Sequence, residues 1–224
     1  MKKYFSLVLT LTMVFSLAAC GNSGAAESSS PASGESGTSS EVIEVILQSE
    51  EPQTEVSSEP ETETGSNSLI VYFSWSGNTE SVANEIQAQT GGDIFEIVPA
   101  EPYTDDYDAL LDLAQEEQAN GARPAIAETV ENFEQYDTVY FGFPNWWGDM
   151  PMILYTFLDE YDFSGKTIAP FVTSGGSGFS GTISTIESLE PDAAVTEGLS
   201  LGSSEAGDPA DAVSEWLAAI GLDQ

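Results

Sequence analysis

Residues 69–80 read "LIVYFSWSGNTE": five apolar residues, Leu69 to Phe73, run directly into a turn of hydroxyls, a glycine and an amide. An apolar run of this length, bounded by turn residues, is typical of a strand buried on both faces. Gly77 allows a tight turn, and the apolar spacing of residues 82–86 predicts a helix after it. The stretch therefore predicts a strand, a tight turn and a helix whose first N–H groups are free to bind an anion.

The same alternation of strand and helix patterns continues to the C-terminus. Further apolar runs that predict strands lie at residues 94–98, 138–143, 167–172 and 194–201. Helical patterns lie between the runs, and strands that alternate with helices favour a parallel α/β sheet covered on both faces. One residue resists this reading: Pro170 interrupts an inner strand, where a proline removes a ladder donor. A bulge or a strand end would accommodate it.

Three helical patterns follow the first helix. One covers residues 109–119 and is predicted to end at Asn120-Gly121, and a second is the stripe of Ile126, Val130 and Phe133. The last helix has Asp208 as its predicted cap and Pro209 as its first residue. Its apolar stripe is Val213, Trp216, Leu217 and Ile220, followed by Gly221.

Composition excludes several classes of function. The 224 residues include 4 Lys plus Arg, 38 Asp plus Glu and no histidine, for a net charge of −34. Nucleic acid is excluded as a partner because phosphate backbones are bound by clustered Lys and Arg. A Ser-His-Asp or Cys-His triad, a His or Cys metal site and an intramolecular disulfide are also excluded, because Cys20 is the only cysteine. The charge fits either a basic protein partner or solubility alone.

The N-terminus predicts export and anchoring. Residues 1–20 have two lysines, a short apolar core and small residues before Cys20, which is a signal-peptide pattern. Its end, "LAACG", resembles the lipobox of bacterial lipoproteins, in which the cysteine becomes lipid-modified; the alternative is ordinary secretory cleavage. Residues 21–67 are rich in Ser, Gly and Glu and contain no Lys or Arg, so we expect a disordered tether. The globular domain is then residues 68–224, outside the cytoplasm and lipid-anchored to a bacterial membrane.

Loops after the predicted strands carry the candidate binding residues, because ligands of open α/β sheets bind at the carboxyl ends of the strands. The turn after the first strand offers neutral donors and a helix N-terminus to an anion. Paired tryptophans, Trp146 and Trp147, follow the third strand, and their faces suit a flat conjugated ring. The loop after the fourth strand is rich in Gly and Ser. Each loop alone also fits ordinary capping, packing or flexibility.

Two phosphate-binding motifs are present only in appearance. A Walker A loop fails because Glu160 stands where its first glycine should be, and Lys166 precedes a strand. Gly176, Gly178 and Gly181 match the spacing of the dinucleotide fingerprint, but they follow the fourth strand and do not open the first βαβ unit. The three loops together predict a site for flavin mononucleotide (FMN), with no metal.

Residues 69–224 resemble the flavodoxin-like family in "LIVYFSWSGNTE", "YDTVYFGFPNWWGDMP" and "GKTIAPFVTSGGSG". The resemblance implies a doubly wound, five-stranded parallel sheet in order 2-1-3-4-5, three layers (α/β/α) and non-covalent FMN. It implies that the phosphate is held by Ser74, Ser76, Gly77, Asn78 and Thr79, with Trp75 nearby. The isoalloxazine would be lined by Pro144, Asn145, Trp146 and Trp147, and its other edge by Ser174, Gly175, Gly176, Ser177 and Gly178. In the family a backbone carbonyl can face flavin N5, and the segment Trp147-Gly148-Asp149 is the candidate here.

These observations favour a membrane-anchored electron carrier with FMN as its cofactor and a redox protein as its partner. Two alternatives stay open. One is an FMN-dependent NAD(P)H:quinone-type oxidoreductase, because the fold supports both uses. The other is a lipoprotein that binds a small ligand without redox chemistry. Flavodoxins are normally cytoplasmic, so the predicted anchor bears on the identity of the partners.

Overall fold

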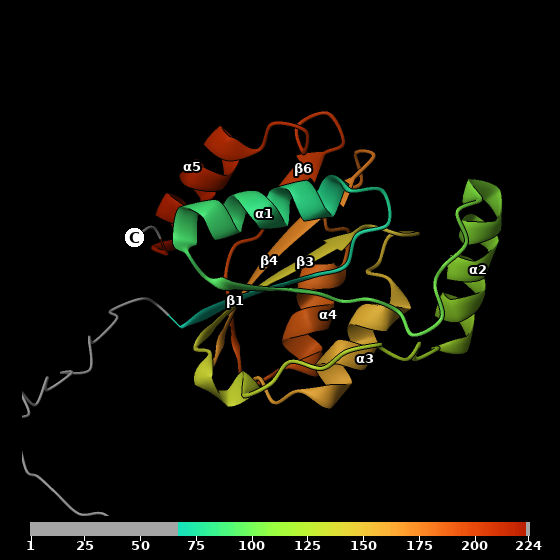
Figure 1. Cartoon of the computed structure of the whole chain (residues 1–224), viewed down its shortest axis with the longest axis horizontal. Helices are drawn as coiled ribbons and strands as arrows, with labels where there is room; N and C mark the ends of the chain where they lie inside the picture. Colours follow the sequence, from blue (N-terminus) through green and yellow to red (C-terminus); the bar gives the residue numbers. More distant parts are fainter. Residues whose placement is uncertain (1–66, 223–224) are drawn as a thin grey trace, which may run out of the picture. The chain divides into compact units, whose positions relative to one another are not determined.

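The computed structural model describes residues 67–222, which form one α/β domain (Figure 1). The predicted signal peptide, Cys20 and nearly all of the predicted tether lie outside the described residues. The strands are β1 (Ser68–Tyr72), β2 (Asp93–Glu96), β3 (Thr138–Pro144), β4 (Thr167–Ser174), β5 (Ala194–Val195) and β6 (Leu199–Gly202). The helices are α1 (Asn78–Thr90), α2 (Tyr107–Asn120), α3 (Met152–Glu160), α4 (Thr182–Leu189) and α5 (Ala210–Ile220), with a short 3₁₀ turn at Phe133–Gln135.

All the strand pairs are parallel, and the sheet order β2-β1-β3-β4-β5 confirms the predicted topology. β6 pairs with the C-terminal half of β4, from Phe171 to Ser174, on the same side as β5. β1 is an inner strand: Ile70 lies beside Ile94 of β2 on one side and Tyr140 of β3 on the other. Because the strand order reverses between β1 and β3, the connections after them lead to helices on opposite faces of the sheet, which leaves room for a ligand between the loops.

Helices cover both faces of the sheet, with α1 and α5 on one face and α3 and α4 on the other (Figure 1). Alternate residues of the first strand serve the two cores: Leu69 and Val71 face one, Ile70 and Tyr72 the other. Burying each large apolar side chain contributes roughly 1.5–3 kcal/mol. This double burial explains the continuous apolar run seen in the sequence.

Pro170 lies inside β4 without breaking the sheet. The Thr167 N–H donates to Asp137 O on the β3 side, and Ile168 O accepts from Thr196 N on the other side. Backbone N–H groups point alternately to the two sides of a strand, so an N–H at position 170 would point away from β3. On that side β5 pairs only with Thr167 and Ile168, and β6 begins opposite Phe171. Pro170 occupies the gap between two short strands, so no ladder bond is lost.

The same gap corrects the prediction of one strand over residues 194–201. The structure has two strands, and the chain between them passes close to β4 and to Phe179 at Gly198. A Cβ atom there would lie 2.4 Å from the Phe179 ring and 3.0 Å from Pro170 O. The pairing with β4 stops at Ile168 and resumes at Phe171, and Pro170 between them has no N–H to donate to a ladder.

Two predictions about helices are wrong. Ile126, Val130 and Phe133 do pack on one core, but from an irregular chain: Ile126 bridges Pro99, and Val130 N donates to the Tyr161 hydroxyl. Asp208 does not cap α5, which begins at Ala210 with Pro209 as its N-cap and no side-chain cap. α2, by contrast, ends at Asn120, with Gly121 in the left-handed conformation, as predicted.

α2 differs from the other helices in its position. It stands away from the sheet beside the carboxyl ends of the strands (Figure 1) and makes its main helix contact with α3. No helix within residues 67–222 is long and apolar enough to cross a membrane.

Candidate functional site

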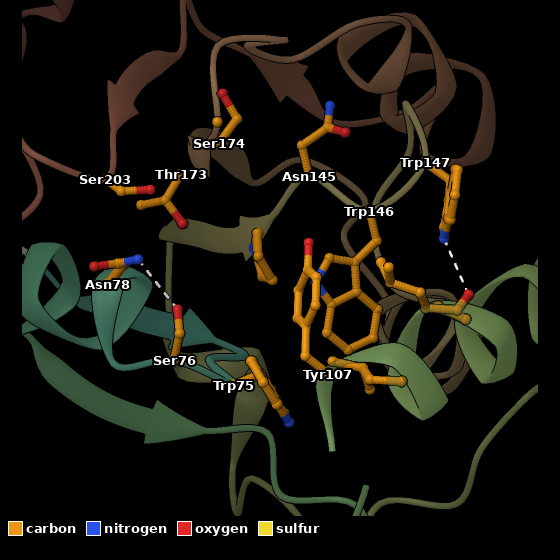
Figure 2. Close-up of a pocket in the computed structure, with 15 residues that line it drawn as sticks. Trp75, Ser76, Asn78, Tyr107, Asn145, Trp146, Trp147, Thr173, Ser174 and Ser203 are labelled. Atoms are coloured by element: carbon orange, nitrogen blue, oxygen red, sulfur yellow. Dashed lines mark hydrogen bonds between the residues drawn. The ribbon is translucent and has the colours of Figure 1, made fainter. Parts of the chain in front are cut away.

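A pocket of about 510 Å³ lies at the carboxyl ends of β1, β3, β4 and β6, with α2 as its outer wall (Figure 2). The predicted site residues that line it are Trp75, Ser76, Asn78, Pro144, Asn145, Trp146, Trp147, Ser174 and Gly175. Six further residues line it that the sequence did not indicate: Tyr107, Leu110, Leu111, Ala114, Thr173 and Ser203. The other predicted residues are not on its surface: Ser74, Gly77, Thr79, Gly148, Gly176, Ser177 and Gly178.

The turn after β1 brings the start of α1, with unpaired N–H groups, to the pocket, whose lining includes Ser76 and Asn78. Gly77 is the N-cap of α1 at φ 83°, and no side chain caps this helix. The first N–H to find a helical partner is that of Ser81, which donates to Gly77 O. The N–H groups of residues 78–80 have no hydrogen-bond partner within the described chain. An uncapped helix start of this kind is a ready anion site.

Side chains of the turn divide into those that shape it and those that face the pocket. Ser74 Oγ accepts from Gly77 N at 3.1 Å and so closes the turn. Thr79 is buried, and its hydroxyl lies 2.8 Å from that of Thr173 on β4. Ser76 and Asn78 line the pocket, and the Asn78 amide donates to Ser76 Oγ at 3.1 Å (Figure 2).

The loop after β3 is a tight two-residue turn. Trp146 and Asp149 exchange backbone hydrogen bonds of 2.8 and 3.1 Å, and both residues between them have positive φ: 55° for Trp147 and 81° for Gly148. That combination matches a type I′ turn. A side chain in the left-handed conformation costs about 1–2 kcal/mol. The surroundings hold Trp147 there: its Nε1 donates to Leu111 O on α2 at 3.2 Å.

Asn145 connects the loops after β3 and β4. Its Oδ1 accepts from Gly148 N at 3.0 Å, and its Nδ2 donates to Gly178 O at 2.7 Å. Ser174 Oγ in turn accepts from Gly176 N and Gly178 N at 3.2 and 3.0 Å. The glycine-rich loop is therefore folded on itself, and of its predicted residues Ser174 and Gly175 reach the pocket.

α2 supplies the apolar wall that sequence reasoning missed. Its pocket residues, Tyr107, Leu110, Leu111 and Ala114, are spaced i, i+3, i+4 and i+7, which is one helical face. The spacing was visible in the sequence, but an apolar helical stripe is usually core. The position of this stripe depends on α2 standing off the sheet. Thr173 and Ser203 carry no comparable sequence signal.

No residue that lines the pocket is charged. Ten of the 38 acidic residues lie in residues 21–67, which leaves 28 in residues 68–224 against Arg123 and Lys166, a net charge of −26. Both cations are engaged elsewhere. Arg123 pairs with Asp159, and the Lys166 ammonium donates to the carbonyls of Phe133, Glu134 and Tyr136.

The two ends of the pocket differ in chemistry, and the difference fits FMN. One end has unpaired N–H groups, a hydroxyl and an amide, which suit a phosphate. The other has indole rings and the apolar face of α2, which suit a planar ring system. The volume falls within the range of small-ligand pockets, roughly 300–1,000 Å³.

Comparison with known proteins agrees with this geometry. The family model described as flavodoxin matches residues 67–220. A flavodoxin of Synechocystis sp. (strain ATCC 27184 / PCC 6803 / Kazusa) is 30% identical over 106 residues, which are 46% of this chain and 48% of that protein. The chain thus matches about half the length of this curated relative.

Two solved structures match more of the domain. A Bacteroides eggerthii protein classed as a flavoprotein is 34% identical with a TM-score of 0.63, covering 70% of this chain and 99% of that one. A flavoprotein of Lactobacillus acidophilus in complex with FMN is 25% identical with a TM-score of 0.54. That match covers 65% of this chain and 99% of the other.

Proposed function

This chain belongs to the flavodoxin family, and from that premise we propose that it is an electron-transfer protein, held at a membrane by a lipid on Cys20. FMN is the cofactor, and when bound it supplies one- and two-electron redox chemistry. The observation that carries the proposal is the uncharged pocket with a phosphate end and an aromatic end.

The residues of the pocket divide the work of binding. The uncapped start of α1, with the hydroxyl of Ser76 and the amide of Asn78, holds the phosphate. Trp75, Trp146 and Trp147 with the face of α2 enclose the ring system and exclude water from one side. Asn145 fixes the loops after β3 and β4 relative to each other, and these loops would line the edge of the ring system.

The charge of the domain tunes the flavin. A net charge of −26 in residues 68–224, with no cation in the pocket lining, disfavours further negative charge there. We expect the bound FMN to be harder to reduce than free FMN. A potentiometric titration measures this, and a bound potential above that of free FMN would contradict the electrostatic account.

The same charge favours a protein partner over a nicotinamide nucleotide. A nucleotide carries phosphates, and the domain's two cations are held by Asp159 and by backbone carbonyls. Mixing the FMN-loaded protein with NADH or NADPH under anaerobic conditions tests this. Bleaching of the flavin within seconds, without a partner protein, would favour the oxidoreductase alternative.

The membrane anchor rests on the sequence around Cys20. Cys20→Ala should move the protein expressed in a bacterial host from the membrane to the soluble fraction, and the mass of the wild-type protein should show a lipid adduct. A wild-type protein without the adduct would mean ordinary secretory cleavage.

A further inference from the structure

All three tryptophans of the pocket are attached to one stretch of chain. We call Trp75, Trp146 and Trp147 the aromatic wall, and residues 103–117 the clasp segment, which contains the turn before α2 and most of that helix. Trp75 Nε1 donates to Thr104 O at 3.0 Å. Trp147 Nε1 donates to Leu111 O at 3.2 Å (Figure 2). The Trp146 ring meets the Tyr103 ring edge-to-face at 5.5 Å. Rings from two separate loops thus share one support.

The backbone of Trp146 is fixed by its hydrogen bonds to Asp149, but its indole ring is held by ring contacts. Its indole N–H has no hydrogen-bond partner within the described residues, and its two aromatic neighbours are Phe73 and Tyr103, each 5.5 Å away. These two rings also meet each other at 5.6 Å. Phe73 is 3% exposed and follows β1, so it is fixed by the core. Tyr103 is the member of the cluster that lies outside the core strands, and its ring packs edge-to-face against the Trp146 indole.

Tyr103 is in turn fixed from α2. Its hydroxyl donates to Glu117 Oε2 at 2.9 Å. Burial raises the pKa of Tyr103, and the nearby charge of Glu117 raises it further, so the phenol keeps its proton at neutral pH. Glu117 lies three residues after Ala114, whose side chain lines the pocket. One hydrogen bond therefore connects α2, the outer wall of the pocket, to the Tyr103 ring that packs against Trp146.

We propose that Tyr103 is a positioning residue for the aromatic wall, and that Glu117 fixes Tyr103 from α2. The seating of α2 and the orientation of Trp146 then depend on each other, and a ligand that packs on Trp146 stabilises α2. The proposal rests on the proposed function in taking FMN as that ligand. The arrangement of the rings in the ligand-free protein does not depend on the proposed function.

The test uses three single-atom or near-isosteric variants. Tyr103→Phe removes the hydroxyl and keeps the ring, and Glu117→Gln keeps an acceptor without the charge. Tyr136→Phe is the matched control: Tyr136 also donates to a carboxylate, Asp93 Oδ2, at 2.7 Å, but at the opposite edge of the sheet. Near-ultraviolet circular dichroism of each ligand-free protein reports the tryptophan environment. Fluorescence titration gives the FMN affinity.

We expect Tyr103→Phe to change the near-ultraviolet spectrum and to weaken FMN binding about fivefold, because a hydrogen bond to a carboxylate is lost. Glu117→Gln should have a smaller effect in the same direction, and Tyr136→Phe should match wild type in both readouts. FMN should also slow amide exchange in residues 107–117 of the wild type more than in Tyr103→Phe.

The outcomes separate this proposal from the proposed function. A wild-type protein that binds no FMN refutes the function, and the ligand-free spectra still decide the positioning role. If the Tyr103→Phe spectrum and affinity equal those of wild type, Tyr103 does not position the wall. If far-ultraviolet circular dichroism shows that Tyr103→Phe is unfolded, Glu117→Gln carries the same comparison, and a wild-type result for it overturns the proposal.

Discussion

The two edges of the sheet use charge in opposite ways. At the carboxyl ends of the strands, called the carboxyl edge below, the pocket is lined by hydroxyls, amides, rings and apolar side chains without a single charged side chain. The amino edge is the end at which the strands begin. At the amino edge, Lys166 is 8% exposed, and its ammonium gathers three backbone carbonyls in front of β3. Near the start of β5, burial and the repulsion of Asp162 and Asp159 raise the pKa of Glu190 to about 7. At the amino edge charge therefore acts on the stability of the fold, favourably at Lys166 and unfavourably at Glu190, while at the carboxyl edge it is absent from the pocket lining.

The largest effect expected from this division is on stability, at the amino edge. Lys166→Met removes a donor from the carbonyl of Phe133, which keeps the Tyr136 N–H, and leaves the carbonyls of Glu134 and Tyr136 without their donor. It should lower the free energy of unfolding by about 2–3 kcal/mol. FMN affinity should stay within about twofold of wild type because Lys166 is remote from the pocket. Urea denaturation of the ligand-free protein and an FMN titration measure the two quantities.

Arg123→Met is the matched control for the other cation. The Arg123 and Asp159 side chains are 40% and 51% exposed, so their pair should contribute less than about 1 kcal/mol. Equal losses of stability in the two variants would mean that the buried carbonyl cluster is not what Lys166 supports.

Two hydroxyls of the β1 turn separate binding from stability within the carboxyl edge itself. Ser76→Ala should weaken FMN binding about tenfold and leave unfolding nearly unchanged, because its hydroxyl faces the pocket. Thr79→Val should lower stability by about 1–3 kcal/mol, because it leaves the buried Thr173 hydroxyl without its partner. The same pair of titrations checks both variants. A reversed pattern would place the phosphate deeper, against Thr79.

The smallest effect concerns the pH dependence of stability at the amino edge. The pKa of Glu190 rises from 4.5 to about 7 on folding, so the folded state binds its proton more tightly than the unfolded state. The resulting stability is present below pH 4.5 and is lost as the pH rises to about 7. Glu190→Gln should therefore be more stable than wild type at pH 8 by on the order of 1 kcal/mol, after allowance for solvent screening.

At pH 4 the Glu190→Gln variant and the wild type should unfold at nearly the same urea concentration. A variant that is equally stabilised at both pH values would show that the gain comes from packing and not from the removal of a charge.

Much of the fold followed from local patterns in the sequence. The double-faced burial of residues 69–73 left a continuous apolar run, and a glycine turn before an apolar stripe gave the start of α1. What failed depended on tertiary placement. Ile126, Val130 and Phe133 have helical spacing, yet Pro124 precedes them and an irregular chain delivers all three to one core. Pro170 is accommodated by a gap between β5 and β6 that no local pattern announces.

The site was predictable to a similar extent and for the same reason. Loops at the ends of β1, β3 and β4 meet because parallel strands align their carboxyl ends, so nine predicted residues line the pocket. The face of α2 was missed because its apolar stripe looks like any core stripe until the helix is seen to stand off the sheet. The clasp segment binds Trp75 and Trp147 through the backbone carbonyls of Thr104 and Leu111, which are 29 and 36 positions away in sequence. Any residue type supplies a backbone carbonyl, so the sequence does not indicate these contacts.

Phosphate binding at the turn after β1 is tested most directly by titrating the ligand-free protein with FMN and with riboflavin, which has the same ring system and no phosphate. If neutral donors and the start of α1 hold the phosphate, FMN should saturate one site per chain with quenched tryptophan fluorescence, and riboflavin should bind at least about 100-fold more weakly. Equal affinity for the two flavins, or no uptake of FMN, would contradict it.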